Sequence, residues 1–173
     1  MRFLKLAVVS FLVLFGLTTA IGLLFPSTVK VSRAVNISAP VDSVYKYLED
    51  VKYWKLWMAG ADTGTISFLS AKTAGKGTVA TVGTGQVTIV NTTKDSILTE
   101  WKSQQGNIQQ SAFIVLQSGS TTTVEWYFQQ LIGWYPWERF GSLANDKLLG
   151  PVMEESFDKL KKVLEKPAAG FNQ

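Results

Sequence analysis

Residues 109–131 read QQSAFIVLQSGSTTTVEWYFQQL, in which two apolar, β-branched segments flank a Ser-Gly-Ser turn. They predict strands at 109–117 and 122–131, because β-branched and aromatic side chains suit a pleated sheet, while Gly and Ser favour turns. Trp126 and Phe128 are two residues apart, so they share one face of the second strand. We expect that apolar face to point into the core.

The same pattern extends upstream to residue 63 without any helical periodicity. Short turn sequences interrupt the β-branched runs, which is typical of an antiparallel meander. Two of these turns, GKG at 75–77 and GTG at 83–85, match no dinucleotide-binding or P-loop pattern and open no helix, so we interpret them as hairpin turns. The additional predicted strands are 65–70, 78–82, 86–92 and 97–102.

Helical patterns flank this strand-rich region. Residues 29–38 predict a first strand, and Pro40 then stands at a helix-opening position. From residue 140 toward 166 one apolar face repeats every three to four residues, and Pro151 either kinks this helix or begins its second half. The apolar stripes comprise Val41, Val44, Leu48 and Val51 in the short helix, and Leu149, Met153, Phe157, Leu160 and Leu164 in the long one. The order predicts an α+β fold, with a curved antiparallel sheet around a long C-terminal helix.

The N-terminal segment 6–25 reads LAVVSFLVLFGLTTAIGLLF and contains no charge. About 20 residues at ~1.5 Å each span a hydrocarbon core of ~30 Å, and this segment shows no polar face. We therefore predict a transmembrane anchor at 1–26, one α+β domain at 27–166 and a flexible tail at 167–173.

A cleaved signal peptide is the main alternative, because residues 18–20 (TTA) are small and signal peptidase could cut after them. We favour an uncleaved anchor, since the apolar run continues past this site; a buried globular helix is the third interpretation. Arg2 and Lys5 favour a cytoplasmic N-terminus, although Lys30 and Arg33 weaken this bias. The expected localisation is a single-pass membrane protein with its domain on the non-cytoplasmic side.

The composition restricts the chemistry. The chain has no Cys and no His, which excludes disulfides, thiolate or imidazole catalysis, and metal sites that need either ligand. The net charge is +4, and Arg2 and Lys5 carry two of these charges, so a nucleic-acid partner is not predicted. We expect no cofactor and no metal.

Five motifs carry a resemblance to a known group of proteins: SAPVDSVY at 38–45, Asp50-(x)3-Trp54-(x)2-Trp57, RFG at 139–141, KLLGP at 147–151 and LKK at 160–162. Together with the order of elements, they resemble the START-like, Bet v 1-like (SRPBCC) superfamily, and within it the polyketide cyclase/dehydrase-type proteins. The resemblance extends over residues 29–165.

The resemblance implies a helix-grip fold with a cavity between the sheet and the long helix. Members are known as carriers of lipids, hormones and other apolar molecules, a minority are enzymes, and they often have an uncleaved N-terminal helix. The usual proline-bearing WPxWsPW pattern is replaced here by Trp54-Lys55-Leu56-Trp57-Met58, which implies a differently shaped cavity mouth.

Six large apolar residues are candidate ligand contacts: Trp54, Trp57, Trp126, Phe128, Met153 and Phe157. Each can line a cavity or pack in the core, and the two roles share one surface. Glu100 is a weak candidate for a catalytic base, because a buried Glu can have a raised pKa, but no second acid stands at a meaningful spacing.

The first hypothesis on function is a membrane-anchored module that binds a small apolar or lipid-like molecule in an internal cavity. The alternatives are a carboxylate-dependent enzyme of the cyclase or dehydratase type, and a non-catalytic domain that meets a protein partner near the bilayer. We favour binding over catalysis, because the sequence has no recognisable catalytic constellation. Trp134, Tyr135 and Trp137 either enter the membrane interface or close one end of the sheet.

Overall fold

The predicted hairpin at 109–131 lies near the centre of one antiparallel sheet in the computed structural model, which describes residues 2–61, 66–142 and 144–165. In the described part of the chain the sheet has seven strands in the order β1-β7-β6-β5-β4-β3-β2. The order confirms the predicted meander. The first strand extends this sheet at one edge, where it pairs with the last strand. The strands are β1 (Thr28–Ile37), β2 (Ser67–Phe68), β3 (Val79–Val82), β4 (Gly85–Thr92), β5 (Ser96–Lys102), β6 (Ile108–Ser118) and β7 (Thr121–Leu131).

Two glycine-containing segments turn the chain in different ways. Val82 pairs with Gly85, so Gly83 and Thr84 form the predicted two-residue hairpin turn, in which Gly83 has a φ of 59°. The 75–77 segment belongs to the longer connection 69–78 between the antiparallel strands β2 and β3, where the Thr78 N–H donates to the Gly75 carbonyl at 3.1 Å. Gly75 and Gly77 adopt positive φ, which glycine tolerates, and a bridge joins the neighbouring Ala74 to Asp50.

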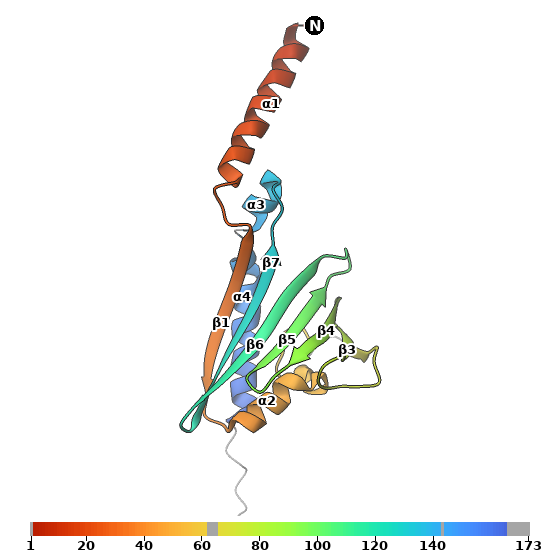
Figure 1. The fold of residues 1–173 in the computed structure, drawn as a ribbon, viewed down its shortest axis with the longest axis vertical. Coiled ribbons are helices and arrows are strands. Elements are labelled where there is room, and N and C mark those ends of the chain that lie inside the picture. The colour runs from red at the N-terminus through yellow and green to blue at the C-terminus, as the bar shows by residue number, and fades with distance from the viewer. Residues whose placement is uncertain (1, 62–65, 143, 166–173) are drawn as a thin grey trace, which may run out of the picture.

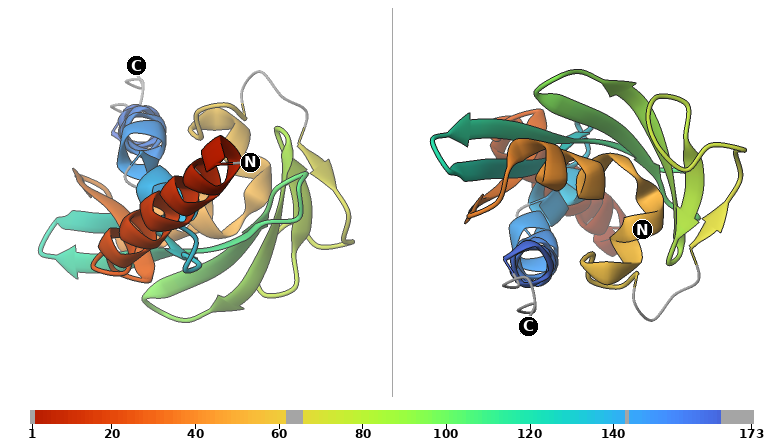
Figure 2. Two further views of the ribbon diagram at one scale, coloured as in Figure 1. Left: turned by 90° about the horizontal axis from the view of Figure 1, so that it is seen from above. Right: turned by 90° about the horizontal axis from the view of Figure 1, so that it is seen from below.

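The helices lie on the concave side of the curved sheet (Figure 2). The region predicted as one helix from residue 140 contains two helices, α3 and α4. The first of them begins earlier than predicted, at Pro136, and proline is a favourable first helical residue. The second helix continues through Pro151 without ending there, so the carbonyl of Lys147 loses its helical donor. The helices of the domain are α2 (Val41–Glu49), the 3₁₀ helix η1 (Val51–Leu56), α3 (Pro136–Ser142) and α4 (Asn145–Leu164).

The N-terminal helix α1 (Arg2–Gly22) extends away from the domain (Figure 1). It is long and apolar enough to cross a membrane, and none of its most apolar window is buried by the rest of the protein. The C-terminal half of α1 contacts α3, where the Phe15 and Trp137 rings lie 6.4 Å apart. The predicted tail at 167–173 lies outside the described residues.

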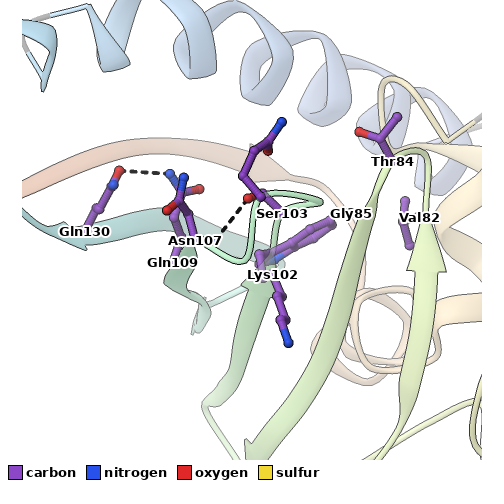
Figure 3. A pocket seen from close by; sticks show the side chains of 10 residues that line it. Val82, Thr84, Gly85, Lys102, Ser103, Asn107, Gln109 and Gln130 are labelled. Atoms are coloured by element: carbon purple, nitrogen blue, oxygen red, sulfur yellow. Dashed lines mark hydrogen bonds between the residues drawn. The ribbon is translucent and has the colours of Figure 1, made fainter.

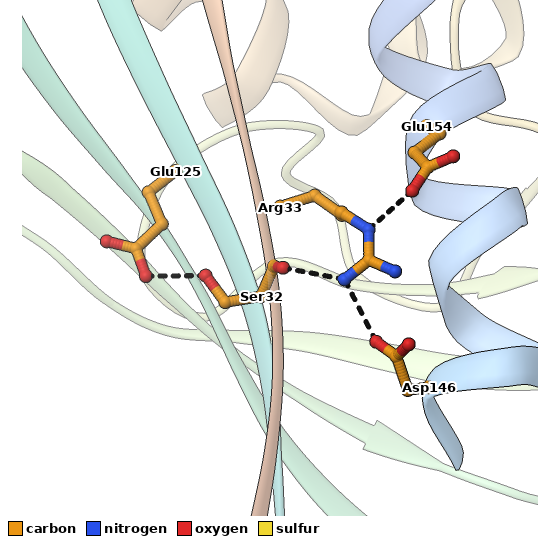
Figure 4. A network of polar contacts seen from close by, with 5 residues as sticks. All are labelled: Ser32, Arg33, Glu125, Asp146 and Glu154. Carbon is orange, nitrogen blue, oxygen red and sulfur yellow. Dashed lines mark hydrogen bonds and ion pairs between the residues drawn. The ribbon is translucent and has the colours of Figure 1, made fainter. Parts of the chain in front are cut away.

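A polar network fastens α4 to β1 (Figure 4). The Arg33 guanidinium donates to Asp146 at 2.9 Å and to Glu154 at 2.6 Å, and both carboxylates belong to α4. Glycine at position 150 leaves room for the guanidinium, which would have to shift if a Cβ stood there. These two ion pairs hold α4 against β1.

On the outer face of the same sheet, Glu125 is expected to make stability depend on pH. It accepts hydrogen bonds from Ser32 at 2.6 Å and Lys30 at 3.2 Å, and these, Ser32 first, hold the pKa of its carboxyl below the usual value. A lowered folded-state pKa contributes stability above the unfolded pKa, and that contribution is lost as pH falls through the folded pKa. We expect Glu125→Gln to destabilise the domain at pH 7 by less than about 1 kcal/mol, as for exposed ion pairs.

Urea unfolding at pH 7 and near pH 3 tests this prediction. The difference between wild type and Glu125→Gln should shrink at the acid pH, as the Glu125 carboxyl takes up a proton. Ser32→Ala should reproduce part of the neutral-pH effect, because it removes the leading hydrogen bond. A difference of equal size at both pH values would contradict the assignment.

Candidate functional site

Aromatic rings fill the deep part of the space between the sheet and the helices. Trp54 in the 3₁₀ helix η1 and Trp57, its C-cap residue, are fully buried, and the Trp57 ring lies 5.9 Å from Phe113 and 6.2 Å from Trp126. Their indole N–H groups donate to the Leu48 and Tyr47 carbonyls at 2.9 and 3.1 Å. The expected internal cavity is therefore occupied by the protein's own side chains at this depth.

Beside this aromatic cluster, a cleft of about 420 Å³ opens to the surface between α4, the β3–β4 turn and strands β5 and β7. Its volume falls within the ~300–1,000 Å³ typical of small-molecule sites. The lining is largely apolar and comes from six separate parts of the chain. It comprises Met58, Ala59, Gly60, Val82, Gly83, Thr84, Trp101, Gln109, Trp126, Phe128, Leu149, Val152 and Met153.

The structure divides the six candidate ligand contacts into two groups. Trp126, Phe128 and Met153 line the cleft. Trp54, Trp57 and Phe157 lie in the core behind it, and the Phe157 ring packs edge-on against Trp126 at 6.0 Å. The first group lines the cleft, and the second group packs behind the first in the core.

Several lining residues were missed by the sequence reasoning. Trp101 lies in a predicted strand, and its alternation with the buried Thr99 is the signal that would have placed it inward. Leu149 belongs to the predicted apolar stripe of α4, whereas Val152 is 42% exposed and lies beside that stripe. Gly83 and Thr84 carry no such signal, because only the curvature of the sheet brings their turn to the cleft.

The lining offers few polar groups. Among the residues described there it contains no Asp, Glu, Lys or Arg, and its polar side chains are those of Thr84 and Gln109. The Trp126 indole N–H already donates to Ser111 at 2.8 Å, and that of Trp101 donates to Thr99 at 3.2 Å. The cleft therefore presents apolar surface with its indole donors already satisfied.

Glu100 does not contribute to this cleft. In β5, Ile97 and Thr99 are buried and Trp101 lines the cleft, so the alternating Glu100 lies on the opposite face of the strand. The enzyme hypothesis required an ionisable group facing the cavity. The placement of Glu100 does not meet that requirement.

A polar groove continues from the cleft, past the β5–β6 turn (Figure 3). It has a volume of about 370 Å³ and shares Val82, Thr84, Trp101 and Gln109 with the apolar cleft. The Gln109 side-chain amide donates to Gln130 at 3.0 Å in its wall. A further hollow of about 350 Å³ continues from Gln130 to α3, where Glu138 and Ser142 line it. The apolar cleft, the polar groove and the hollow at α3 thus lie next to one another.

A separate hollow of about 530 Å³ lies beside α2. It is larger than the cleft, but its lining includes the charged residues Asp42, Lys94 and Asp95. It also lies outside the space between the sheet and α4. Its chemistry suits an apolar molecule less well than that of the cleft.

Solved structures with this fold share little sequence with the chain. A START superfamily protein from Mycobacterium smegmatis is 16% identical, with a TM-score of 0.59 over 79% of this chain and 97% of its own. SA2116, a protein of unknown function from Staphylococcus aureus, is 13% identical, with a TM-score of 0.64 over 80% of this chain and 94% of its own. DynU16, from the dynemicin biosynthetic locus, is 16% identical with a TM-score of 0.59; the match covers 79% of this chain and 47% of DynU16. At these identities the likeness shows the fold.

The comparison with curated proteins finds no match. Residues 28–165 match the sequence profile of the family described as polyketide cyclase / dehydrase and lipid transport. The match runs from β1 to the end of α4, and it confirms the START-like resemblance carried by the short motifs. The chain therefore belongs to the polyketide cyclase/dehydrase and lipid transport family, with the SRPBCC, START-like fold.

Proposed function

We propose that this protein binds a small apolar or lipid-like molecule whose apolar part occupies the cleft beside α4, while α1 holds the domain at a membrane. The observation that carries the proposal is the 420 Å³ cleft whose described lining is largely apolar and has no ionisable side chain. Trp126, Phe128 and Met153 are the proposed principal contacts. Polar atoms of the ligand would lie toward Gln109 and the polar groove.

The expected energetics favour reversible binding. Burying about ten methylene groups contributes about 8 kcal/mol at ~0.8 kcal/mol each. Association costs about 4–15 kcal/mol in lost translational and rotational freedom. The small difference suits a carrier that loads and releases its ligand more than a permanent storage site.

The proposed membrane attachment is supported by the length and composition of α1. Its 21 residues correspond to about 31 Å of helix, which matches the ~30 Å hydrocarbon core. Arg2 and Lys5 precede the apolar stretch, and we propose that they retain the N-terminus in the cytoplasm. The domain would then lie on the non-cytoplasmic side.

Native mass spectrometry of the full chain, released from detergent micelles, tests the binding proposal. We expect a fraction of molecules to carry an added mass of a few hundred daltons, and solvent extraction to release an apolar or amphipathic compound. A negative result would be the bare chain mass both after purification and after incubation with a panel of phospholipids, fatty acids and polycyclic aromatics. That result would overturn the proposal.

A further inference from the structure

An exposed group of aromatic rings stands at the end of the domain nearest α1. Trp134, Tyr135, Trp137 and Phe140 are 50%, 38%, 61% and 41% exposed, and we call them the aromatic collar. The Trp134 and Tyr135 rings stack at 4.3 Å, and the Tyr135 and Trp137 rings at 4.8 Å. Because these rings stack on one another while remaining exposed, the collar does not serve to fill the core.

The collar is fixed against the last turns of α1. Trp137 contacts the Phe15 ring at 6.4 Å, and Phe140 contacts the Phe25 ring edge-on at 5.8 Å. Between them the buried Arg139 donates to the Phe25 carbonyl at 2.6 Å and to the Gly133 carbonyl at 2.6 Å. The orientation of the collar relative to α1 is therefore defined by specific contacts.

The position of Phe15 along α1 sets the depth of the collar. Phe15 lies seven residues before the end of the helix at Gly22, which corresponds to about 10 Å along its axis. If α1 spans a bilayer, a ring beside Phe15 lies below the headgroup region, among the acyl chains of the same leaflet. Trp and Tyr are favoured at the boundary between headgroups and acyl chains, because their rings are apolar and carry one polar group.

We propose that the aromatic collar inserts into the bilayer interface beside α1 and forms a second membrane contact of the domain. The exposed apolar surface of α1 is continuous with the collar, so a lipid bilayer is the occupant that covers both at once. This inference rests on the proposed function and adds the route of loading to it. The hollow lined by α3 is the last of the three neighbouring hollows, so an inserted collar brings it close to the lipid surface.

Quenching of tryptophan fluorescence by brominated lipid tests the inference in the full chain. The protein is reconstituted into phosphatidylcholine vesicles whose acyl chains carry bromine close to the headgroup, and into unbrominated vesicles. Trp134 and Trp137 are two of six Trp residues, so we expect up to about a third of the emission to be quenched. The double variant Trp134→Phe and Trp137→Phe should lose this part of the quenching, and any quenching that remains comes from lipid beside Trp101 and Trp126 in the cleft.

The matched control is Trp54→Phe, which removes a fully buried Trp of the core and should leave the quenched emission unchanged. Resistance of the chain to alkaline extraction confirms that α1 is inserted in every sample. Equal emission in brominated and unbrominated vesicles would overturn the inference even if the purified protein carries a ligand. Quenching that depends on Trp134 and Trp137 supports the collar even if no ligand is found, and in that case only the binding proposal fails.

Discussion

Replacing Trp57 by Ala is expected to destabilise the domain by about 3–5 kcal/mol, the range found when a fully buried Trp is truncated. The side chain is 0% exposed, and its ring contacts Trp54, Phe113 and Trp126 at 5.9–6.2 Å. The substitution removes these contacts, leaves a cavity and strands the Tyr47 carbonyl that accepts the indole N–H. A loss of this size is a large part of the stability of an ordinary domain.

The midpoint of urea unfolding, followed by near-ultraviolet circular dichroism of the full chain in micelles, measures this effect. Trp134→Ala is the control, because it removes the same residue type from a half-exposed position and should change stability by less than about 1 kcal/mol. Similar losses in both variants would show that Trp57 does not have the structural role assigned to it.

The sequence predicted those parts of the fold that local patterns encode. Strand periodicity, turn residues and the apolar stripe of α4 act over a few residues, so the meander and the long helix could be recognised. The attachment of α4 to β1 could not, since Arg33 meets Asp146 and Glu154 across 113 and 121 residues of chain. No local pattern identifies such partners.

The candidate site was predictable to a similar extent. Trp126, Phe128 and Met153 were found because each lies on an apolar face that must point inward. The space expected between the sheet and α4 is filled in its deep part, because the sequence does not show that segment 54–57 inserts both Trp54 and Trp57 there. Because these side chains fill the deep space, the volume left for a ligand lies in the open cleft. Loop and turn residues supply much of the lining there.

Replacing Val152 by Trp is expected to lower the affinity for the apolar ligand at least about tenfold, which corresponds to about 1.4 kcal/mol. Val152 lines the cleft from α4 and is 42% exposed, so a larger side chain can enter the open space without displacing the core. The ring would occupy volume that the ligand needs. Stability should change by less than about 1 kcal/mol, because the position is partly exposed and helical.

The occupancy of the Val152→Trp variant, measured by native mass spectrometry against wild type, checks this expectation. Leu116→Trp is the matched control, since Leu116 is 59% exposed and lines the separate hollow beside α2. The two variants add the same ring at two different cavities, so they assign the ligand to one of them. If Leu116→Trp abolishes binding and Val152→Trp does not, the ligand occupies the hollow beside α2, and the apolar cleft beside α4 is not its site.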